Sequence, residues 1–272
     1  MTQRMIVIPG SPELAADIAG AGPTVVFVHG IGGNRLNWAG QMETFSGRYQ
    51  TIAVDLRGYG DSADPDDGFA FFDFVDDILR TLDFVGVETA DLVGLSMGGL
   101  VVQAVAARAP ERVRSLTLAG CRAGDSPVFD DPASFAAERI GSLSADAPAT
   151  IAVDAMLPRL LGPAVSPEAA RAIRGSLELL RPANYRRTMM ARLAIPPFLD
   201  LSTIAVPTLV IGASHDKVAP LAQMQGIAAR IPGARFATIA DAGHLMNIEQ
   251  PDAFDTVLAS FLESVPRFVC PS

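Results

Sequence analysis

A serine flanked by glycines is the residue of this chain best placed to act as a nucleophile. The stretch Gly94-Leu95-Ser96-Met97-Gly98-Gly99 has G-x-S-x-G spacing and lies between an apolar run, Ala90–Val93, and a helical pattern, Met97–Arg108. A serine on such a sharp strand-to-helix turn is strained and projects its hydroxyl above the sheet. Larger side chains at Gly94 and Gly98 would collide inside the turn. The pattern predicts a nucleophilic serine, and the alternative is a glycine-rich helix cap with an idle hydroxyl.

A serine hydroxyl needs a base to become a nucleophile at neutral pH. The chain offers three histidines: His29, His215 and His244. His244 follows the last predicted strand and precedes the last predicted helix, so its loop can meet Ser96 at the carboxyl end of a parallel sheet. We therefore expect His244 to be the base and the other two to be loop residues.

The base in turn needs a carboxylate that holds its tautomer and stabilises the imidazolium. Asp216 is the favoured candidate because it follows the predicted strand Val206–Ile211. Asp125 follows the strand after the serine, and Asp241 lies close to the histidine in sequence, so both stay open as alternatives. Each of the three could instead be a loop carboxylate that caps a helix.

Backbone amides are the expected donors to the oxyanion that acyl transfer creates. The segment His29-Gly30-Ile31-Gly32-Gly33 follows a predicted strand, and its glycines let the backbone approach a reacting carbonyl. We expect the N–H groups of Ile31 and Met97 to form the oxyanion hole, where each donor contributes about 2.7–4 kcal/mol to transition-state stabilisation. The helix that begins at Met97 points its positive end at the same place.

Composition limits the remaining possibilities. The chain of 272 residues is 49% apolar, enough for one large α/β domain with or without an insertion. Its net charge of −9 argues against a nucleic-acid surface. The first residues show no signal-peptide pattern and no apolar run is long enough to cross a membrane, so we expect a cytoplasmic protein. Neither Cys121 nor Cys270 has a His, Cys or carboxylate neighbour at the spacing of a metal site, and the sequence motifs of phosphate-binding and dinucleotide-binding loops are absent. No metal or cofactor is therefore expected.

Short apolar runs alternate with helical patterns along most of the chain, which predicts an α/β fold with a mostly parallel sheet of about eight strands and helices on both faces. The first two strands have no helix between them, which suggests an edge hairpin. The predicted strands are Met5–Ile8, Leu14–Ile18, Thr24–Val28, Gln50–Val54, Ala90–Val93, Ser115–Ala119, Val206–Ile211 and Ala234–Ile239. The predicted helices are Phe69–Val85, Met97–Arg108, Leu221–Arg230 and Pro251–Phe261.

The stretch between the sixth and seventh predicted strands differs from the rest of the chain in its sequence pattern. It contains no convincing strand and is interrupted by prolines, including Pro158, Pro167 and Pro182. We predict that residues 122–201 form a helical lid inserted into a core domain made of residues 1–121 and 202–272. A lid at this point would cover the carboxyl ends of the strands. The alternative is that these helices only complete the outer layer of the core.

With these residues in place, the chain resembles the α/β-hydrolase superfamily over nearly its whole length. The resemblance includes the serine turn, His29-Gly30, Asp55-Leu56-Arg57-Gly58-Tyr59-Gly60-Asp61-Ser62 and the strand leading to Asp216. The segment Gly243-His244-Leu245-Met246-Asn247-Ile248-Glu249-Gln250-Pro251 is similar to the 3-oxoadipate enol-lactonases. The resemblance implies the α/β-hydrolase fold, with Ser96 as nucleophile, Asp216 as acid and His244 as base.

These observations predict a serine hydrolase that cleaves an ester or lactone of a small molecule through an acyl-enzyme. The alternatives are a hydrolase that cleaves a C–C bond of a vinylogous diketone, and a non-catalytic binding protein or receptor on the same fold. Lid arginines could pair with a substrate carboxylate. The residues expected to line the substrate pocket are Trp38, Arg139, Met156, Arg159, Leu160 and Met190.

Overall fold

The computed structural model describes residues 3–125 and 149–266 and shows one eight-stranded sheet. The strands follow the order β1-β2-β4-β3-β5-β6-β7-β8, with β1–β2 and β2–β4 antiparallel and all other pairs parallel. The strands are β1 (Arg4–Ile8), β2 (Leu14–Ala19), β3 (Thr24–Val28), β4 (Gln50–Val54), β5 (Ala90–Leu95), β6 (Val113–Ala119), β7 (Thr208–Ala213) and β8 (Arg235–Ile239). All eight predicted strands are therefore confirmed, including the edge hairpin.

The four predicted helices are confirmed, with shifts at their ends, and two short helices, Ala39–Phe45 and Met246–Glu249, were not predicted. The core helices are α1 (Ala39–Phe45), α2 (Asp73–Val85), α3 (Met97–Arg108), α8 (Leu221–Arg230), α9 (Met246–Glu249) and α10 (Pro251–Ser264). The expected helix start at Phe69 is wrong. The Asp73 carboxylate accepts the N–H of Ala70 at 3.1 Å and closes a turn, so α2 begins only at Asp73.

Helices lie on both faces of the sheet. Phe27 in β3 stacks on Trp38, with ring centroids 5.0 Å apart, and packs against Phe45 of α1. Because side chains alternate along a strand, its neighbours Val26 and Val28 point to the opposite face. There α3 packs against β3, β5 and β6. The central strands are consequently buried on both sides, as expected for parallel strands.

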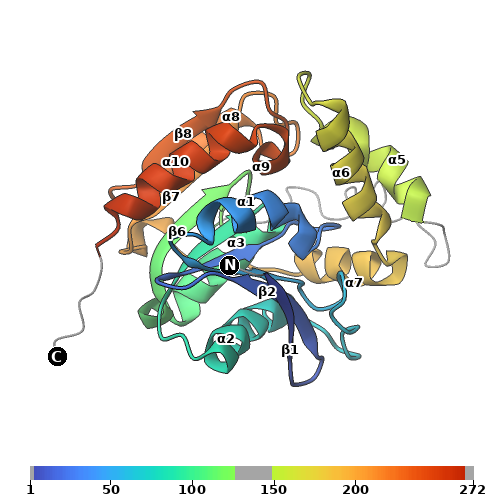
Figure 1. Cartoon of the computed structure of the whole chain (residues 1–272), viewed down its shortest axis with the longest axis horizontal. Coiled ribbons are helices and arrows are strands. Elements are labelled where there is room, and N and C mark those ends of the chain that lie inside the picture. Colours follow the sequence, from blue (N-terminus) through green and yellow to red (C-terminus); the bar gives the residue numbers. More distant parts are fainter. Residues whose placement is uncertain (1–2, 126–148, 267–272) are drawn as a thin grey trace.

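Three helices occupy the chain between β6 and β7 within the described residues: α5 (Ala149–Leu160), α6 (Pro167–Glu178) and α7 (Pro182–Leu193). They lie together at one end of the molecule, and α6 packs against both α5 and α9 (Figure 1). Pro167 and Pro182 each occupy the first helical position, where the missing N–H costs nothing. The expectation that Pro158 separates two helices is wrong, because it lies inside α5. The division into core and lid remains a prediction.

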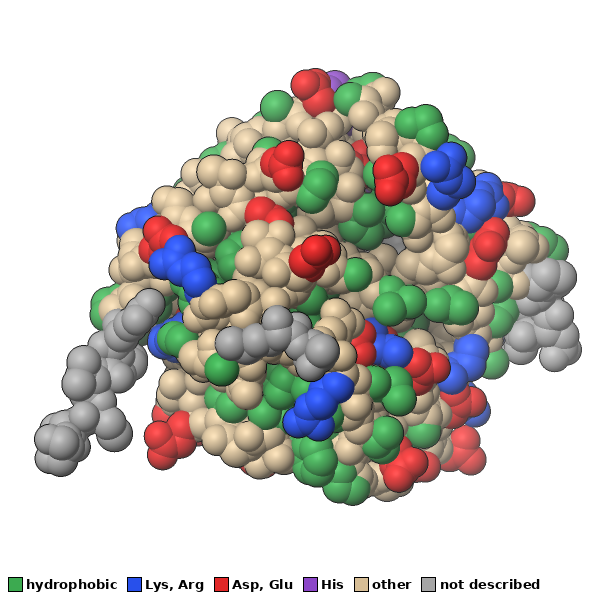
Figure 2. Space-filling model, viewed as in Figure 1, with side chains coloured by type: hydrophobic (Ala, Val, Ile, Leu, Met, Phe, Trp, Pro, Cys, Tyr) green, Lys and Arg blue, Asp and Glu red, His purple; other side chains and the backbone are tan. Residues whose placement is uncertain are grey.

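Charged side chains of both signs are interspersed with apolar ones over the face shown in Figure 2. This distribution accords with a net charge that is spread over the surface. Among the described helices, none combines the length and apolar character needed to cross a membrane.

Candidate active site

Ser96 lies on a strained turn between β5 and α3. Its backbone has φ 55° and ψ −115°, a conformation that residues with a Cβ rarely adopt. The Ser96 N–H donates to the Ala119 carbonyl at 2.9 Å, which holds the turn against β6. A Cβ on Gly94 would overlap the Gly98 carbonyl, and one on Gly98 would overlap the Val28 carbonyl. Both glycines are therefore required by close backbone approach, as the sequence predicted.

Asp216 and His244 form a buried hydrogen-bonded pair. His244 Nδ1 lies 2.8 Å from Asp216 Oδ2, and both side chains are almost completely removed from solvent. Asp216 Oδ1 accepts the N–H groups of Val218 at 2.7 Å and Ala219 at 2.9 Å, which fixes the carboxylate. An ionised Asp216 can only accept, so Nδ1 carries the proton and Nε2 of the neutral ring is left as the basic atom.

The two alternative acids have other partners. Asp125 accepts two hydrogen bonds from Arg230 Nη1, at 2.8 and 2.9 Å. Asp241 is exposed, and its carboxylate lies 3.8 Å from Nε2 of the likewise exposed His215. Only Asp216, of the three candidates, is placed against the His244 ring.

Ser96 and His244 line the same pocket. Among the described residues, no hydrogen bond yet joins the two side chains. Such contacts are often long in substrate-free enzymes and tighten in the Michaelis complex.

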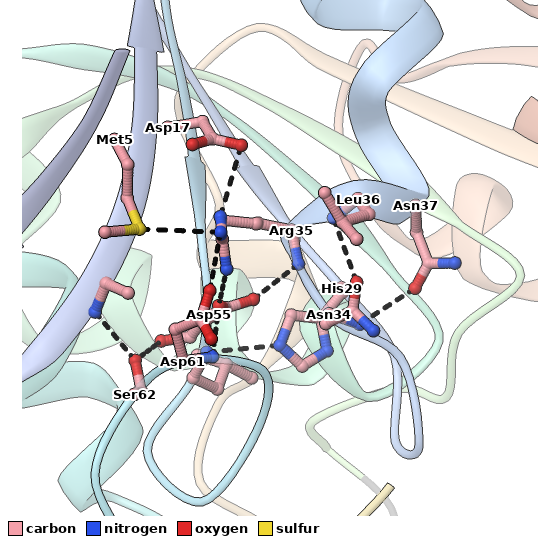
Figure 3. A network of polar contacts seen from close by, with 12 residues as sticks. Met5, Asp17, His29, Asn34, Arg35, Leu36, Asn37, Asp55, Asp61 and Ser62 are labelled. Atoms are coloured by element: carbon pink, nitrogen blue, oxygen red, sulfur yellow. Dashed lines mark hydrogen bonds and ion pairs between the residues drawn. The ribbon is translucent and has the colours of Figure 1, made fainter. Parts of the chain in front are cut away.

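His29 organises the loop that carries the expected oxyanion donor. Its Nε2 accepts the backbone N–H of Leu56 at 3.1 Å (Figure 3). Its Nδ1 donates to the Gly30 carbonyl at 2.7 Å. These two contacts together require the neutral tautomer protonated on Nδ1. Burial lowers the pKa of His29. The ring therefore has no free nitrogen for proton transfer, which favours its expected role as a loop residue.

The oxyanion donors expected from the sequence lie next to the serine. Gly30 and Ile31 line the pocket together with Ser96. Met97 is the first residue of α3, so its N–H belongs to the helix end that has no partner within the helix. The assignment of both amides to an oxyanion hole remains a prediction.

Asp55 holds the His29–Arg35 loop to the segment Asp55–Ser62 (Figure 3). Its carboxylate accepts the N–H of Arg35 at 2.6 Å and of Asp61 at 2.9 Å, and pairs with the Arg35 guanidinium. A Cβ on Gly60, where φ is 50°, would overlap this carboxylate. The segment Asp55–Ser62, which carries part of the resemblance to the α/β-hydrolases, therefore has a structural role: it supports the loop beside Ser96.

The pocket itself has a volume of about 200 Å³. Of the predicted substrate contacts, Met156, Arg159 and Leu160 line it. Leu177, Met189 and Leu245 add further apolar wall. A space of this size, below the usual range for drug-sized ligands, fits a small molecule.

The structure corrects two predicted contacts. Trp38 is fully buried in the core against Phe27 and Phe254, so its indole cannot reach a substrate. Met190 is 52% exposed and lines a separate surface hollow beside Arg187. Arg139 lies outside the described residues.

Four other residues that line the pocket were not predicted to do so: Asn37, Arg122, Tyr185 and Val218. Arg122 lies just beyond the carboxyl end of β6, where ligands bind in open α/β sheets, so the same rule that selected Asp216 could have found it. Arg192, one of the arginines of residues 122–201 considered as carboxylate partners, also lines the pocket and is nearly buried on α7. Only the packing of the helix reveals which of these arginines face inward.

Other reactive groups near the site do not suggest different chemistry. Cys121 is buried against Gly99, and burial raises the pKa of its thiol to about 12, so it stays protonated. Within residues 3–125 and 149–266, no group of three or more His, Cys, Asp or Glu side chains is arranged to hold a metal ion.

Comparison with known proteins places this arrangement in a family. Residues 23–251 match the family described as alpha/beta hydrolase fold. The pyrrolizixenacetamide deacetylase of Xenorhabdus hominickii is 28% identical, with 94% of this chain and 98% of the relative covered. A thermophilic esterase from Thermogutta terrifontis, solved with malate bound, has a TM-score of 0.88 at 28% identity and 96% and 99% coverage. The enol-lactonase from Burkholderia xenovorans LB400 has a TM-score of 0.79 at 29% identity and 93% and 97% coverage. The chain is therefore an enzyme of the α/β-hydrolase family, and within that family it resembles the esterases and enol-lactonases.

Proposed function

We propose that this enzyme is a serine hydrolase that cleaves a carboxylic ester or lactone of a small molecule through an acyl-enzyme. The observation that carries the proposal is the shared pocket of Ser96 and the buried His244–Asp216 pair. Esterases and an enol-lactonase among the similar structures support the bond type.

In this proposal each group has a defined role. Ser96 Oγ attacks the substrate carbonyl carbon while His244 Nε2 takes the hydroxyl proton. The N–H groups of Ile31 and Met97 donate to the oxyanion. His244 then passes its proton to the departing alkoxide, which leaves as an alcohol. A water molecule, deprotonated by the same nitrogen, releases the acid and restores Ser96, while Asp216 stays ionised throughout.

The lining of the pocket favours an acyl or alcohol part that is apolar and carries a carboxylate. Arg122 just beyond β6, Arg159 on α5 and Arg192 on α7 line this pocket among methionine and leucine side chains. Arginine binds carboxylates in bidentate geometry. Substrates with and without a distal carboxylate test this point, and equal kcat/KM for the two series would count against an arginine anchor.

The test of the reaction is steady-state hydrolysis of short p-nitrophenyl esters and simple lactones by wild type and Ser96→Ala, with a vinylogous diketone assayed in parallel. We expect ester or lactone turnover that is lost in the variant, which keeps the Cβ and hence the fold. Turnover of the diketone alone would favour the C–C hydrolase. Tight stoichiometric binding without turnover would favour a binding protein.

A further inference from the structure

A buried carboxylate joins the lid helices to the loop of the expected base. Glu249, the last residue of α9, is 5% exposed. Its Oε2 accepts two backbone N–H groups, from Gly162 at 2.8 Å and from Gly243 at 3.0 Å. Gly162 lies two residues beyond the end of α5, and Gly243 directly precedes His244. One oxygen atom therefore bridges two segments more than eighty residues apart in sequence.

A direct backbone contact reinforces this bridge. The His244 N–H donates to the Leu160 carbonyl at 2.7 Å. A Cβ on Gly162 would lie 2.5 Å from the Gly243 nitrogen and 2.9 Å from Glu249 Oε2, closer than a side chain can approach. The two segments therefore meet backbone to backbone, and Gly162 is required for that contact. We call the set Leu160, Gly162, Gly243, His244 and Glu249 the clasp.

The chemistry of the clasp suits a rigid restraint. Hydrogen bonds from N–H groups to an ionised carboxylate are shorter and stronger than neutral ones. Burial raises the pKa of Glu249, while the N–H groups of Gly243 and Gly162 favour the carboxylate and oppose that shift. Asp216 restrains the His244 ring through Nδ1, whereas the clasp restrains the His244 backbone. The two restraints act on different atoms of one residue.

We propose that Glu249 is a positioning residue for the reaction: it holds the lid segment Leu160–Gly162 against the His244 loop, so that the location of the base depends on the lid. This inference rests on the proposed function, since it assigns a base to be positioned. A misplacement of about 1 Å at a catalytic group can cost about 10²-fold in rate. Loss of the clasp should therefore lower kcat strongly without removing any group that touches the substrate.

The experiment compares variants that break the clasp from its two sides. Glu249→Leu removes the acceptor, Glu249→Gln keeps an acceptor oxygen, and Gly162→Ala forces the segments apart. Matched controls lie in the same lid: Glu168 is exposed, and a Cβ on Gly175 would meet nothing within 4 Å, so Glu168→Gln and Gly175→Ala test the same chemical changes without the clasp. Each variant is assayed for kcat and KM on p-nitrophenyl acetate and for its melting temperature.

We expect Glu249→Leu and Gly162→Ala to lose about 30–100-fold in kcat with KM within threefold of wild type. Glu249→Gln should stay within about fivefold, and both controls should match wild type. The double variant Glu249→Leu/Gly162→Ala should lose no more kcat than the worse of the two single variants, because both changes break the same contact. A purely structural residue would lower the melting temperature but leave kcat per folded enzyme unchanged.

The proposed positioning role of Glu249 would be overturned if folded Glu249→Leu and Gly162→Ala kept the wild-type kcat. If Ser96→Ala still abolished wild-type turnover, the proposed serine hydrolase would stand. Full additivity of the two single effects would also overturn it. Absence of turnover in the wild type would overturn the proposed function and, with it, the role of the clasp.

Discussion

The strained backbone of Ser96 makes a prediction that does not depend on substrate. A residue with a Cβ held at φ 55° and ψ −115° costs of the order of 1–3 kcal/mol, and glycine adopts such a conformation without that cost. Glycine in turn loses about 0.5–1 kcal/mol more on folding through its larger unfolded-state entropy. We therefore expect Ser96→Gly to be more stable than Ser96→Ala by about 1 kcal/mol. Both variants lack the hydroxyl, so the comparison isolates the Cβ.

The assay is thermal and urea unfolding of the two variants. For a chain of this size, 1 kcal/mol corresponds to a melting temperature about 2–4 °C higher. With an m-value of about 3 kcal/mol/M it corresponds to a urea midpoint about 0.3 M higher. Ser46 is the control, because its φ of −63° and ψ of −17° are ordinary helical values. There glycine should be less stable than alanine. If Ser96→Gly proves no more stable than Ser96→Ala while the Ser46 pair behaves normally, the turn stores no strain and the reasoning fails.

Two further predictions address the histidines and their partners. Asp216→Asn should lower kcat about 10³–10⁴-fold, because the His244 ring then loses its required tautomer. Asp125→Asn should change kcat little, because that carboxylate pairs with Arg230. Equal losses of kcat in the two variants would refute Asp216 as the acid. Because burial lowers the pKa of His29 below its ordinary value of 6.5, the neutral ring contributes stability that is full above pH 6.5 and is lost as the pH falls through the lowered pKa. NMR of the imidazole C–H signals should show no protonation of His29 near pH 6.5, and a normal titration there would refute the buried neutral ring.

The fold and the convergence of Ser96, Asp216 and His244 could be predicted because one geometric rule connects them. In a parallel sheet the carboxyl ends of the strands meet at one edge, so Ser96 after β5, Asp216 after β7 and His244 after β8 converge although they are distant in sequence. Periodicity located those strands, and the rule required no knowledge of packing.

The pocket could not be predicted in the same way, because it depends on which side of a helix faces inward. Met189 lines the pocket and its neighbour Met190 is exposed. Asn37 lines the pocket and its neighbour Trp38 lies in the core. In each pair the sequence favours either both residues or the more apolar one as a pocket residue. Consecutive residues on a helix, however, point in different directions, so only one of them reaches the pocket. Burying the large indole removes more apolar surface from water than burying an amide would, so Trp38 packs in the core while Asn37 lines the pocket.

The clasp limits how the segment between β6 and β7 can change. Leu160 lines the pocket and its carbonyl accepts the His244 N–H, so under the proposed roles one residue would affect both substrate fit and base position. Side chains of α5 and α7 can vary without moving the clasp, because its contacts use backbone atoms and one carboxylate. Insertions or deletions near Gly162 would move the clasp, because they would displace the backbone that meets Gly243. Substrate range should therefore respond to point substitutions along α5 and α7, whereas turnover should fail when the length of the segment between α5 and α6 changes.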